Sequence, residues 1–234
     1  MENLKRKIFC ALDFSEIEET IEFVKLIQDH IGGIKVGIEF FLKNGISGVQ
    51  SLKKFGLPIF LDLKLNDIPN TVKKASLNIL DLEPEYLTVH LNGGYEMVRS
   101  IVEIKKKTKI IGVSLLTSLN QKDLKSFGIQ ISTKEFVHKL AKIGKHAGVD
   151  GMVSSPLEVK FLKKKMPEDF IFITPGIRLS GDVDDQKRIS TPSEALKNGS
   201  SILIIGRTIT QAKDPVETIE KIIVNMSEEY GSKN

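Results

Sequence analysis

The feature that most constrains the fold is a series of eight short apolar runs, separated by segments with helical periodicity. Most of these runs are too short and too continuously apolar for surface helices, so they predict strands buried on both faces of a parallel sheet. The expected strands cover residues 8–14, 34–41, 58–65, 86–91, 109–117, 151–155, 170–177 and 201–208.

Apolar residues recur at helical spacing in the segments 15–31, 133–147 and 191–198. We expect Ser15 to cap the first of these helices and Thr133 to cap the second, which Gly148 is placed to end. Strands that alternate with helices imply parallel β-α-β units with right-handed crossovers.

The number of these units favours a closed (β/α)₈ TIM barrel over an open doubly wound sheet. Eight units in 234 residues are close to what the barrel requires, and no Gly-x-Gly-x-x-Gly follows the first run. A composition that is 41% hydrophobic and 27% charged suits a sizeable core. No linker, repeat or low-complexity stretch divides the chain. We therefore predict a single α/β barrel domain over residues 1–234, with its active site at the C-terminal ends of the strands.

Charge and rare residues argue against several other classes of function. The net charge of +4 is mild, and the lysine runs at 105–107 and 163–165 lack interleaved aromatic residues, so they indicate solvated helix faces rather than a nucleic-acid surface. Cys10, the single cysteine, lies in an apolar run and is expected to be a buried thiol. The four histidines lack metal-ligand spacing, and no metal site is predicted.

The hydropathy pattern predicts no membrane association. No stretch approaches the roughly 20 apolar residues of a membrane span. The apolar run after the basic start of the chain reaches Asp13 too soon for a signal peptide. We therefore expect a cytoplasmic protein.

Residues 62–71 concentrate charge where the third run ends. Side chains alternate along a strand, so Asp62 and Lys64 are expected on the same side. Asp67 follows before Pro69, which cannot continue a paired strand. Alternating charges of this kind are typical of a catalytic strand end, and a structural salt bridge is the alternative.

Lys35 lies within the second apolar run, where an unpaired lysine is costly to bury. Together with Asp62, Lys64 and Asp67 it forms an expected quartet of alternating charge on strands 2 and 3. Polar residues also follow the other strands. These are Asp13, His90, Asn92, Thr117, Ser118, Arg178 and Arg207.

The loops after strands 7 and 8 are the usual phosphate position of this fold. There Gly206 frees backbone N–H groups, and Arg207 can offer a bidentate fork to a phosphate. An ion pair at the barrel rim is the alternative for Arg207. His90 fits a satisfied structural histidine as well as a catalytic one. Loop capping is the alternative reading for Asn92, Thr117 and Ser118.

Taken in order, these segments resemble the orotidine 5′-phosphate decarboxylase family, which makes UMP in the last step of de novo pyrimidine synthesis. The resemblance covers nearly the whole chain, and its most specific block is Asp-x-Lys-x-x-Asp-Ile-Pro-x-Thr at residues 62–71. The other matching segments are Ala11-Leu12-Asp13, Lys35-Val36-Gly37, Thr88-Val89-His90, Leu116-Thr117-Ser118, Thr174-Pro175-Gly176-Ile177-Arg178, Asp185-Gln186 and Ile205-Gly206-Arg207. The chain departs from many bacterial members at Asn66, where they have histidine, and at Leu91-Asn92, where they have Ala-Ser.

The resemblance implies roles for the charged residues. Lys64 is the implied proton donor to C6 of the pyrimidine, and Lys35, Asp62 and Asp67 complete the catalytic array. The family resemblance also implies a homodimer in which Asp67 reaches into the active site of the partner subunit. Thr71 is implied to contact the ligand near that shared site, so the active site would lie at the dimer interface.

The remaining residues carried over from the family hold the nucleotide. Asp13, Lys35 and Asp62 are implied substrate contacts, the first two through the ribose hydroxyls. Thr117 and Ser118 are implied to meet the pyrimidine edge. The implied phosphate site comprises Arg178, Gln186, Gly206 and Arg207, with Gln186 on a loop over the ligand. The implied reaction uses no cofactor and no metal.

Loss of CO₂ at C6 leaves a carbanion that the ring π system cannot delocalise, so the protein must stabilise that charge electrostatically. A fixed ammonium beside C6 does this and can then deliver the proton, which suits Lys64. Asp62 has two alternative roles that the sequence leaves open. It either repels the substrate carboxylate or keeps Lys64 charged and oriented.

Two other functions are compatible with parts of this pattern. A Mg²⁺-dependent sugar-phosphate decarboxylase or synthase of the same barrel superfamily shares the Asp-x-Lys-x-x-Asp strand. The continuation at residues 68–71 and the Pro-Gly-Ile-Arg loop speak against it. A catalytically silent nucleotide-binding barrel has little reason to crowd four charges together.

Overall fold

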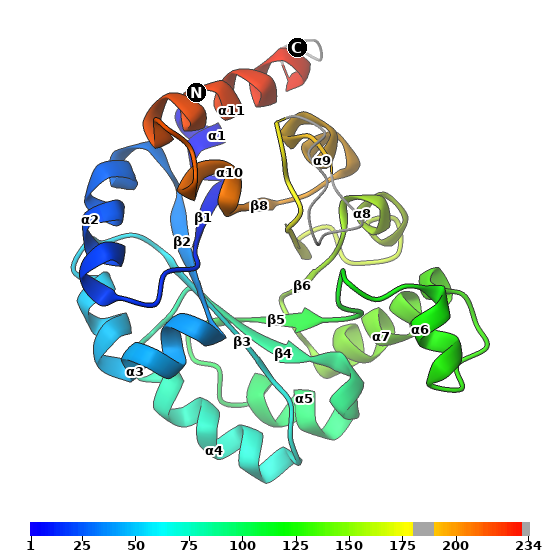
Figure 1. Ribbon diagram of the computed structural model, residues 1–234. Coiled ribbons are helices and arrows are strands. Elements are labelled where there is room, and N and C mark those ends of the chain that lie inside the picture. The colour runs from blue at the N-terminus through cyan, green and yellow to red at the C-terminus, as the bar shows by residue number, and fades with distance from the viewer. Residues whose placement is uncertain (180–189, 231–234) are drawn as a thin grey trace.

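Parallel strands in a closed ring form the centre of the molecule, with helices around the outside (Figure 1). The structure is a computed structural model that describes residues 1–179 and 190–230. Within these residues eight strands pair in chain order, and the last returns to pair with the first. The strands are β1 (Ile8–Leu12), β2 (Gly33–Gly37), β3 (Ile59–Leu65), β4 (Tyr86–His90), β5 (Lys109–Val113), β6 (Gly151–Val153), β7 (Ile171–Thr174) and β8 (Ile202–Ile205). The predicted single-domain (β/α)₈ barrel is confirmed.

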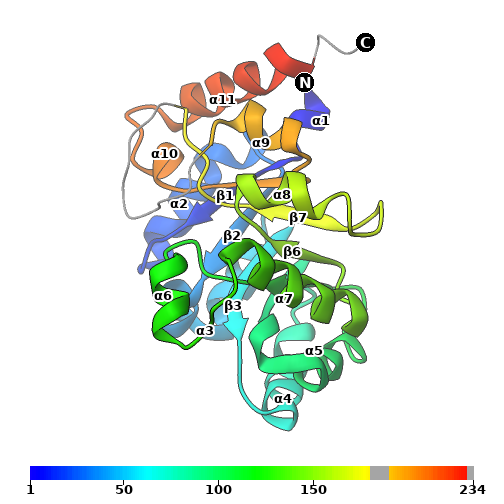
Figure 2. The same cartoon turned by 90° about the vertical axis from the view of Figure 1, so that its right-hand side faces the viewer.

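Helices follow the strands along the chain and cover the sides of the barrel (Figure 2). The longer helices are α2 (Ile17–Ile27), α3 (Ile38–Lys53), α4 (Pro69–Leu80), α5 (Gly94–Val102), α7 (Thr133–Ala147) and α11 (Pro215–Tyr230). The shorter ones are α1 (Glu2–Lys5), α6 (Gln121–Ser126), α8 (Pro156–Leu162), α9 (Pro192–Asn198), α10 (Arg207–Thr210) and the 3₁₀ turns η1 (Gln28–His30) and η2 (Leu91–Gly93). None of the helices in the described ranges combines the length and apolarity needed to span a bilayer.

Seven of the eight predicted strands were too long at their C-terminal ends, β3 being the exception, and in two of them the excess residues belong to an α-helix. β2 stops at Gly37, and α3 begins at Ile38 within the predicted strand 34–41. β8 likewise stops before Gly206, and Arg207 begins α10. In both cases the glycine occupies the position just before the helix, where the chain turns out of the barrel. A short apolar run continues from a buried strand into the buried turn of a helix, and periodicity alone does not separate the two.

The predicted N-terminal caps are wrong by one residue at two helices. Glu16 rather than Ser15 precedes α2, and Ser132 rather than Thr133 caps α7. Gly148 ends α7 in the left-handed conformation with φ of 87°, as predicted.

The apolar core has two layers, one inside the barrel and one between the barrel and its helices. Alternation along β1 places Phe9 and Ala11 in the inner layer and Cys10 in the outer one. Cys10 is fully buried, as predicted, and this burial raises the pKa of its thiol. The inner layer comprises Phe9, Ala11, Phe60, Tyr86, Ile111, Ile173, Ile202 and Ile204.

Ion pairs tie together the N-terminal ends of β4, β5 and β6. Lys109 at the start of β5 donates to Glu85, just before β4, at 2.5 Å. Lys105 donates to Asp150, just before β6, at 2.5 Å. The Asp150 carboxylate also accepts the backbone N–H of Ile110 at 2.8 Å. These contacts hold the starts of neighbouring strands in register.

Candidate active site

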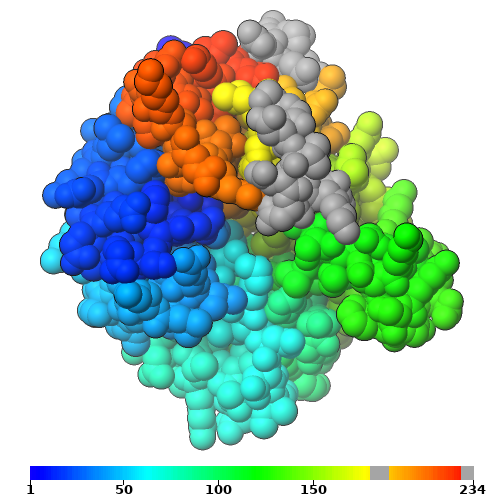
Figure 3. Space-filling view, viewed as in Figure 1, coloured from blue at the N-terminus to red at the C-terminus, as the bar shows by residue number. Residues whose placement is uncertain are grey.

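A pocket of about 440 Å³ lies at the C-terminal ends of the strands, where the active site was expected. Its floor belongs to the inner apolar layer, and its walls are polar. Figure 3 shows the molecule from this end of the barrel, with the blue-to-cyan first third of the chain on one side and the green segment on the other. One wall carries Asp13, Lys35, Glu39, Asp62 and Lys64, and the other carries Thr117, Ser154, Ser155, Gly176, Arg178, Gly206 and Arg207.

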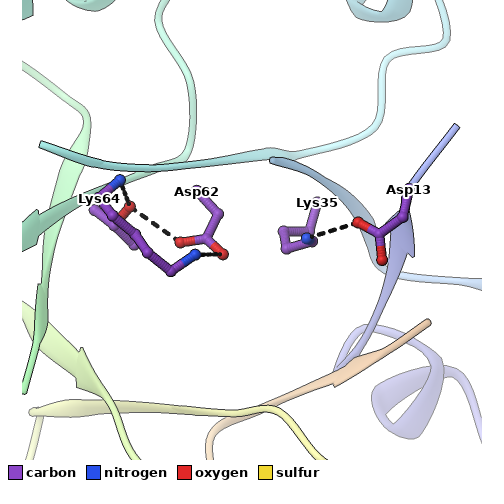
Figure 4. A network of polar contacts seen from close by, with 5 residues as sticks. Asp13, Lys35, Asp62 and Lys64 are labelled. Atoms are coloured by element: carbon purple, nitrogen blue, oxygen red, sulfur yellow. Dashed lines mark hydrogen bonds and ion pairs between the residues drawn. The ribbon is translucent and has the colours of Figure 1, made fainter. Parts of the chain in front are cut away.

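Two ion pairs lie along the wall formed by β1, β2 and β3 (Figure 4). The Lys64 Nζ atom donates to Asp62 Oδ2 at 2.6 Å, and Lys35 Nζ donates to Asp13 Oδ1 at 3.1 Å. The side chains of Lys35 and Asp62 are only 12% and 14% exposed. Because water is largely excluded from them, their charges interact more strongly than a surface pair. Lys35 is therefore not an unpaired buried lysine.

The backbone of β3 departs from a regular strand beside this wall. Leu61 pairs with Leu87 and Leu65 pairs with Val89, so β3 contains two more residues than β4 between the same two pairings. Lys64 lies in this bulge with φ of 50°, a left-handed conformation that costs a residue with a Cβ atom about 1–2 kcal/mol. Asp62 and Lys64 are in contact as predicted, but the strand between them is bulged, so regular alternation is not what brings them together. Strain of this kind collects at functional sites.

The opposite wall carries positive charge. Arg178 follows β7 and Arg207 begins α10, and among the described residues from β5 to β8 no acidic side chain lines the pocket. The turn after β7 requires a glycine because Gly176 has φ of 77°. Gly206 approaches β1 so closely that an added Cβ atom would lie 3.3 Å from the Cβ of Ala11. Two guanidinium groups on one wall of a pocket suit an anion.

Three predicted residues do not line the pocket of the single chain. Asp67, Thr71 and Ser118 are exposed, and the Asp67 carboxylate accepts the backbone N–H of Ile68 at 2.7 Å. The predicted quartet is therefore three pocket residues and one surface carboxylate within one chain. Gln186 lies outside the described residues.

The pocket also contains residues that the sequence analysis did not assign to it. Glu39 was hidden because residues 34–41 read as one strand, yet it lines the wall from the first turn of α3. Ser154 and Ser155 line the pocket at the end of β6, and a polar pair directly after an apolar strand was the available signal. The buried hydroxyl of Ser154 has no hydrogen-bond partner within residues 1–179 and 190–230.

The pKa of His90, at the end of β4, is affected by the charges of Lys64 and Asp62. Burial and the charge of Lys64 lower the pKa of His90, and Asp62 acts in the opposite direction. Its Nδ1 atom is buried and has no hydrogen-bond partner in the described part of the chain. At neutral pH the imidazole is therefore uncharged. No cluster of three or more His, Cys, Asp or Glu side chains in the described residues is placed to hold a metal ion.

Comparison with known proteins identifies the family of this chain. The sequence profile described as "Orotidine 5'-phosphate decarboxylase / HUMPS family" matches residues 6–222. The chain belongs to this family. A relative from Wolbachia pipientis subsp. Culex pipiens is 42% identical over 223 residues, which cover 94% of this chain and 99% of the relative. One from Sphingopyxis alaskensis is 45% identical over 210 residues, with coverage of 89% and 93%. Both relatives are named orotidine 5′-phosphate decarboxylase.

A solved structure agrees with this family membership. The crystal structure of orotidine 5′-phosphate decarboxylase from Lactobacillus acidophilus superposes with a TM-score of 0.84 at 35% identity, and the match covers 94% of this chain and 99% of that one. The orotidine 5′-phosphate decarboxylase family therefore accounts for both the barrel and the order of the motifs around its pocket.

Proposed function

We propose that this chain decarboxylates orotidine 5′-phosphate to UMP and CO₂, the final step of de novo UMP biosynthesis, in the cytoplasm. The observation that carries the proposal is the Lys64–Asp62 pair at 2.6 Å, held at the rim of a pocket whose far wall carries Arg178 and Arg207. Family membership and the names of the relatives support the same reaction.

Lys64 has the charge and position that this reaction needs. Decarboxylation leaves an electron pair in the plane of the pyrimidine ring, where no π system accepts it. A preorganised ammonium stabilises such a charge without solvent reorganisation and then donates a proton to C6. The ion pair with Asp62 holds the ammonium of Lys64 in place, so little ordering remains to be done during the reaction. No cofactor is required in this scheme.

The arginine wall supplies binding energy remote from the reacting carbon. We assign the phosphate to Arg178, Gly206 and Arg207, with Gln186 as a further contact. Asp13 and Lys35 are assigned to the ribose hydroxyls, and Thr117 and Ser118 to the pyrimidine edge. Binding energy at the phosphate lowers the barrier only if it is realised in the transition state, which requires the whole nucleotide to be gripped at once.

The contacts of Asp62 favour its orienting role. Its Oδ2 atom accepts from Lys64 Nζ, and its Oδ1 atom accepts from the Thr88 hydroxyl at 3.1 Å. A carboxylate that is engaged at both oxygens is held in one rotamer. It keeps the ammonium aimed into the pocket. Repulsion of the substrate carboxylate can act in addition, at the same position.

The direct test mixes the purified chain with orotidine 5′-phosphate and follows the loss of its ultraviolet absorbance. We expect turnover with one UMP formed per substrate consumed, and the same rate in EDTA as in Mg²⁺. Activity that disappears in EDTA would indicate the Mg²⁺-dependent sugar-phosphate chemistry instead. Binding of UMP without any turnover would indicate a silent nucleotide-binding barrel.

We further propose a homodimer in which Asp67 and Thr71 complete the site of the partner subunit. Both residues are exposed and outside the pocket of their own chain, and Leu42 and Ile68 expose large apolar side chains, at 80% and 68%. Exposed apolar groups of this size suit a protein interface.

Subunit mixing tests this arrangement. Asp67→Asn and Lys64→Ala are each expected to be inactive alone, because each lacks one charge of the array. After mixing and exchange, one site of every mixed dimer is intact, so random pairing restores about a quarter of wild-type activity. An inactive mixture, with exchange verified, would show that Asp67 acts within its own chain.

A further inference from the structure

Thr88 has a buried hydroxyl that links the two charged residues of β3. Its Oγ1 atom accepts the backbone N–H of Lys64 at 2.8 Å and contacts Asp62 Oδ1 at 3.1 Å. The residue is fully buried in the middle of β4. It faces the bulge in β3 between the two regular pairings of these strands.

The bulge explains why a side chain is needed there. In a regular parallel sheet the backbone N–H groups of an inner strand are paired with backbone carbonyls of the strands on either side. At Lys64 the left-handed backbone and the two extra residues take the N–H out of that ladder. The Thr88 hydroxyl accepts it instead, so the strained conformation of Lys64 leaves no buried donor unpaired.

The direction of these hydrogen bonds is fixed by their chemistry. A backbone N–H can only donate, so the hydroxyl oxygen is the acceptor toward Lys64. Its single proton is then free to donate to Asp62 Oδ1. Lys64 Nζ donates to the other oxygen, Oδ2. One hydroxyl thus fixes the backbone of the lysine and the carboxylate that orients its ammonium.

We propose that Thr88 is a positioning residue for decarboxylation, which holds Lys64 and Asp62 in the geometry of the reaction. It contacts neither the pocket nor the reacting atoms and acts through these two residues. This inference rests on the proposed function. Threonine suits the role because its branched Cβ restricts χ1, whereas serine has the hydroxyl without that restriction.

The test compares two substitutions that separate shape from hydrogen bonding. Thr88→Val keeps the shape and removes both hydrogen bonds, and Thr88→Ser keeps the hydroxyl. We expect Thr88→Val to lower kcat by about 100-fold, because a small misplacement of a reacting group has an effect of this size. KM and the Kd for UMP should stay within about 3-fold of wild type, because the arginine wall is unchanged. Thr88→Ser should recover kcat to within about 5-fold of wild type.

Thr20→Val is the matched control for loss of a buried hydroxyl. Thr20 is also fully buried, and its hydroxyl donates at 2.7 Å to the carbonyl of Glu16, the residue that precedes α2, away from the pocket. We expect this variant to lose thermal stability without a change in kcat. An equal loss of kcat in Thr20→Val and Thr88→Val would overturn the proposal, as would wild-type kcat in Thr88→Val or a failure of Thr88→Ser to recover activity.

A crystal structure of Thr88→Val gives a readout that does not depend on activity. We expect Lys64 to leave its left-handed conformation and its Nζ atom to separate from Asp62 beyond ion-pair distance. An unchanged pair would contradict the positioning role even if the wild-type chain failed to decarboxylate orotidine 5′-phosphate. That failure of the wild type would instead count against the proposed function.

Discussion

Both ends of the barrel carry lysine–carboxylate pairs in or beside the strands, and these pairs differ in what surrounds them. At the N-terminal end of the strands, Lys105–Asp150 and Lys109–Glu85 join the starts of neighbouring strands. At the C-terminal end, Lys35–Asp13 and Lys64–Asp62 line one wall of the pocket.

The difference lies in the backbone and the available space. Asp150 accepts a backbone N–H of β5 as well as a lysine, so its pair reinforces the strand pairing beside it. Lys64 instead lies in a bulge with a left-handed backbone, and its ammonium lies at the wall of an open pocket. Pairs of the same type, a lysine with a carboxylate, therefore stabilise the barrel at one end and are positioned for chemistry at the other.

The largest effect is expected when the lysine of the pocket is removed. Lys64→Ala should lower kcat by about 10⁴-fold or more, because it removes both the charge beside C6 and the proton donor. UMP binding and the melting temperature should change little. Steady-state kinetics, UMP titration and thermal unfolding measure the three quantities. Substantial kcat in this variant would refute the assignment of Lys64.

Lys109→Ala is the matched substitution at the other end. It also removes one lysine from a close ion pair, but from a pair that does not line the active-site pocket. We expect kcat within about 2-fold of wild type and a loss of up to about 1 kcal/mol in the free energy of unfolding. A large loss of kcat here would mean that the two ends are coupled.

An intermediate effect on stability is expected from the carboxylates. Asp150→Ala leaves Lys105 and the N–H of Ile110 without their partner, which should lower the free energy of unfolding by about 1–3 kcal/mol. Asp13→Ala should lower it by less, about 1 kcal/mol, because the Asp13 side chain is 58% exposed, although its loss leaves the largely buried Lys35 without its ion-pair partner. Urea unfolding compares the two variants. The reverse order of the two losses would contradict the contrast between the barrel ends.

The smallest effect is a pH dependence of stability from His90. Its folded pKa lies below the ordinary value of 6.5, so below that pH the unfolded chain binds a proton that the folded chain does not. The free energy of unfolding should therefore fall as the pH drops through 6.5, by at most about 1.4 kcal/mol per pH unit from this group. His90→Gln should flatten that slope in urea unfolding at several pH values.

His138→Gln separates burial from surface charge. The pKa of His138 is also lowered, by burial and then by Lys165 and Lys142, but this residue lies outside the pocket, with its ring against Phe161 of α8. The part of its slope that Lys165 and Lys142 cause should weaken in high salt, whereas the part that burial causes should persist for both histidines. A slope that vanishes entirely in salt would show that burial of His90 has little influence.

Most of the barrel could be predicted from the sequence because buried parallel strands are nearly continuous apolar runs. The errors occurred at the C-terminal ends of the strands, where the apolar run continues into the next segment. Ile38, for example, begins α3 but reads as strand. Gly37 precedes α3 and Gly206 precedes α10, so a glycine marks the boundary in both places. A glycine within an apolar run is equally compatible with a strand, so the signal was ambiguous.

The site was predictable to the extent that it depends on strand ends. Lys35, Asp62 and Lys64 line the same wall of the pocket, as expected, because neighbouring parallel strands end at the same edge. The bulge in β3 was not predictable, because no glycine marks it and a charged residue occupies the left-handed position. The role of Thr88 was also missed, because its contacts with β3 depend on the register between the two strands, which no local sequence pattern reveals.

The seam between β1 and β8 has a consequence for how the chain is made. Ile8 pairs with Leu203, and the Leu203 N–H donates to the Lys7 carbonyl at 2.8 Å. A ribosome adding about 5–20 residues per second needs roughly 10–40 s to make the stretch between them. During that time the outer edge of an entirely buried apolar strand has no partner. Vectorial synthesis therefore exposes β1 longest, and a chaperone that binds short apolar segments should engage the nascent chain there first.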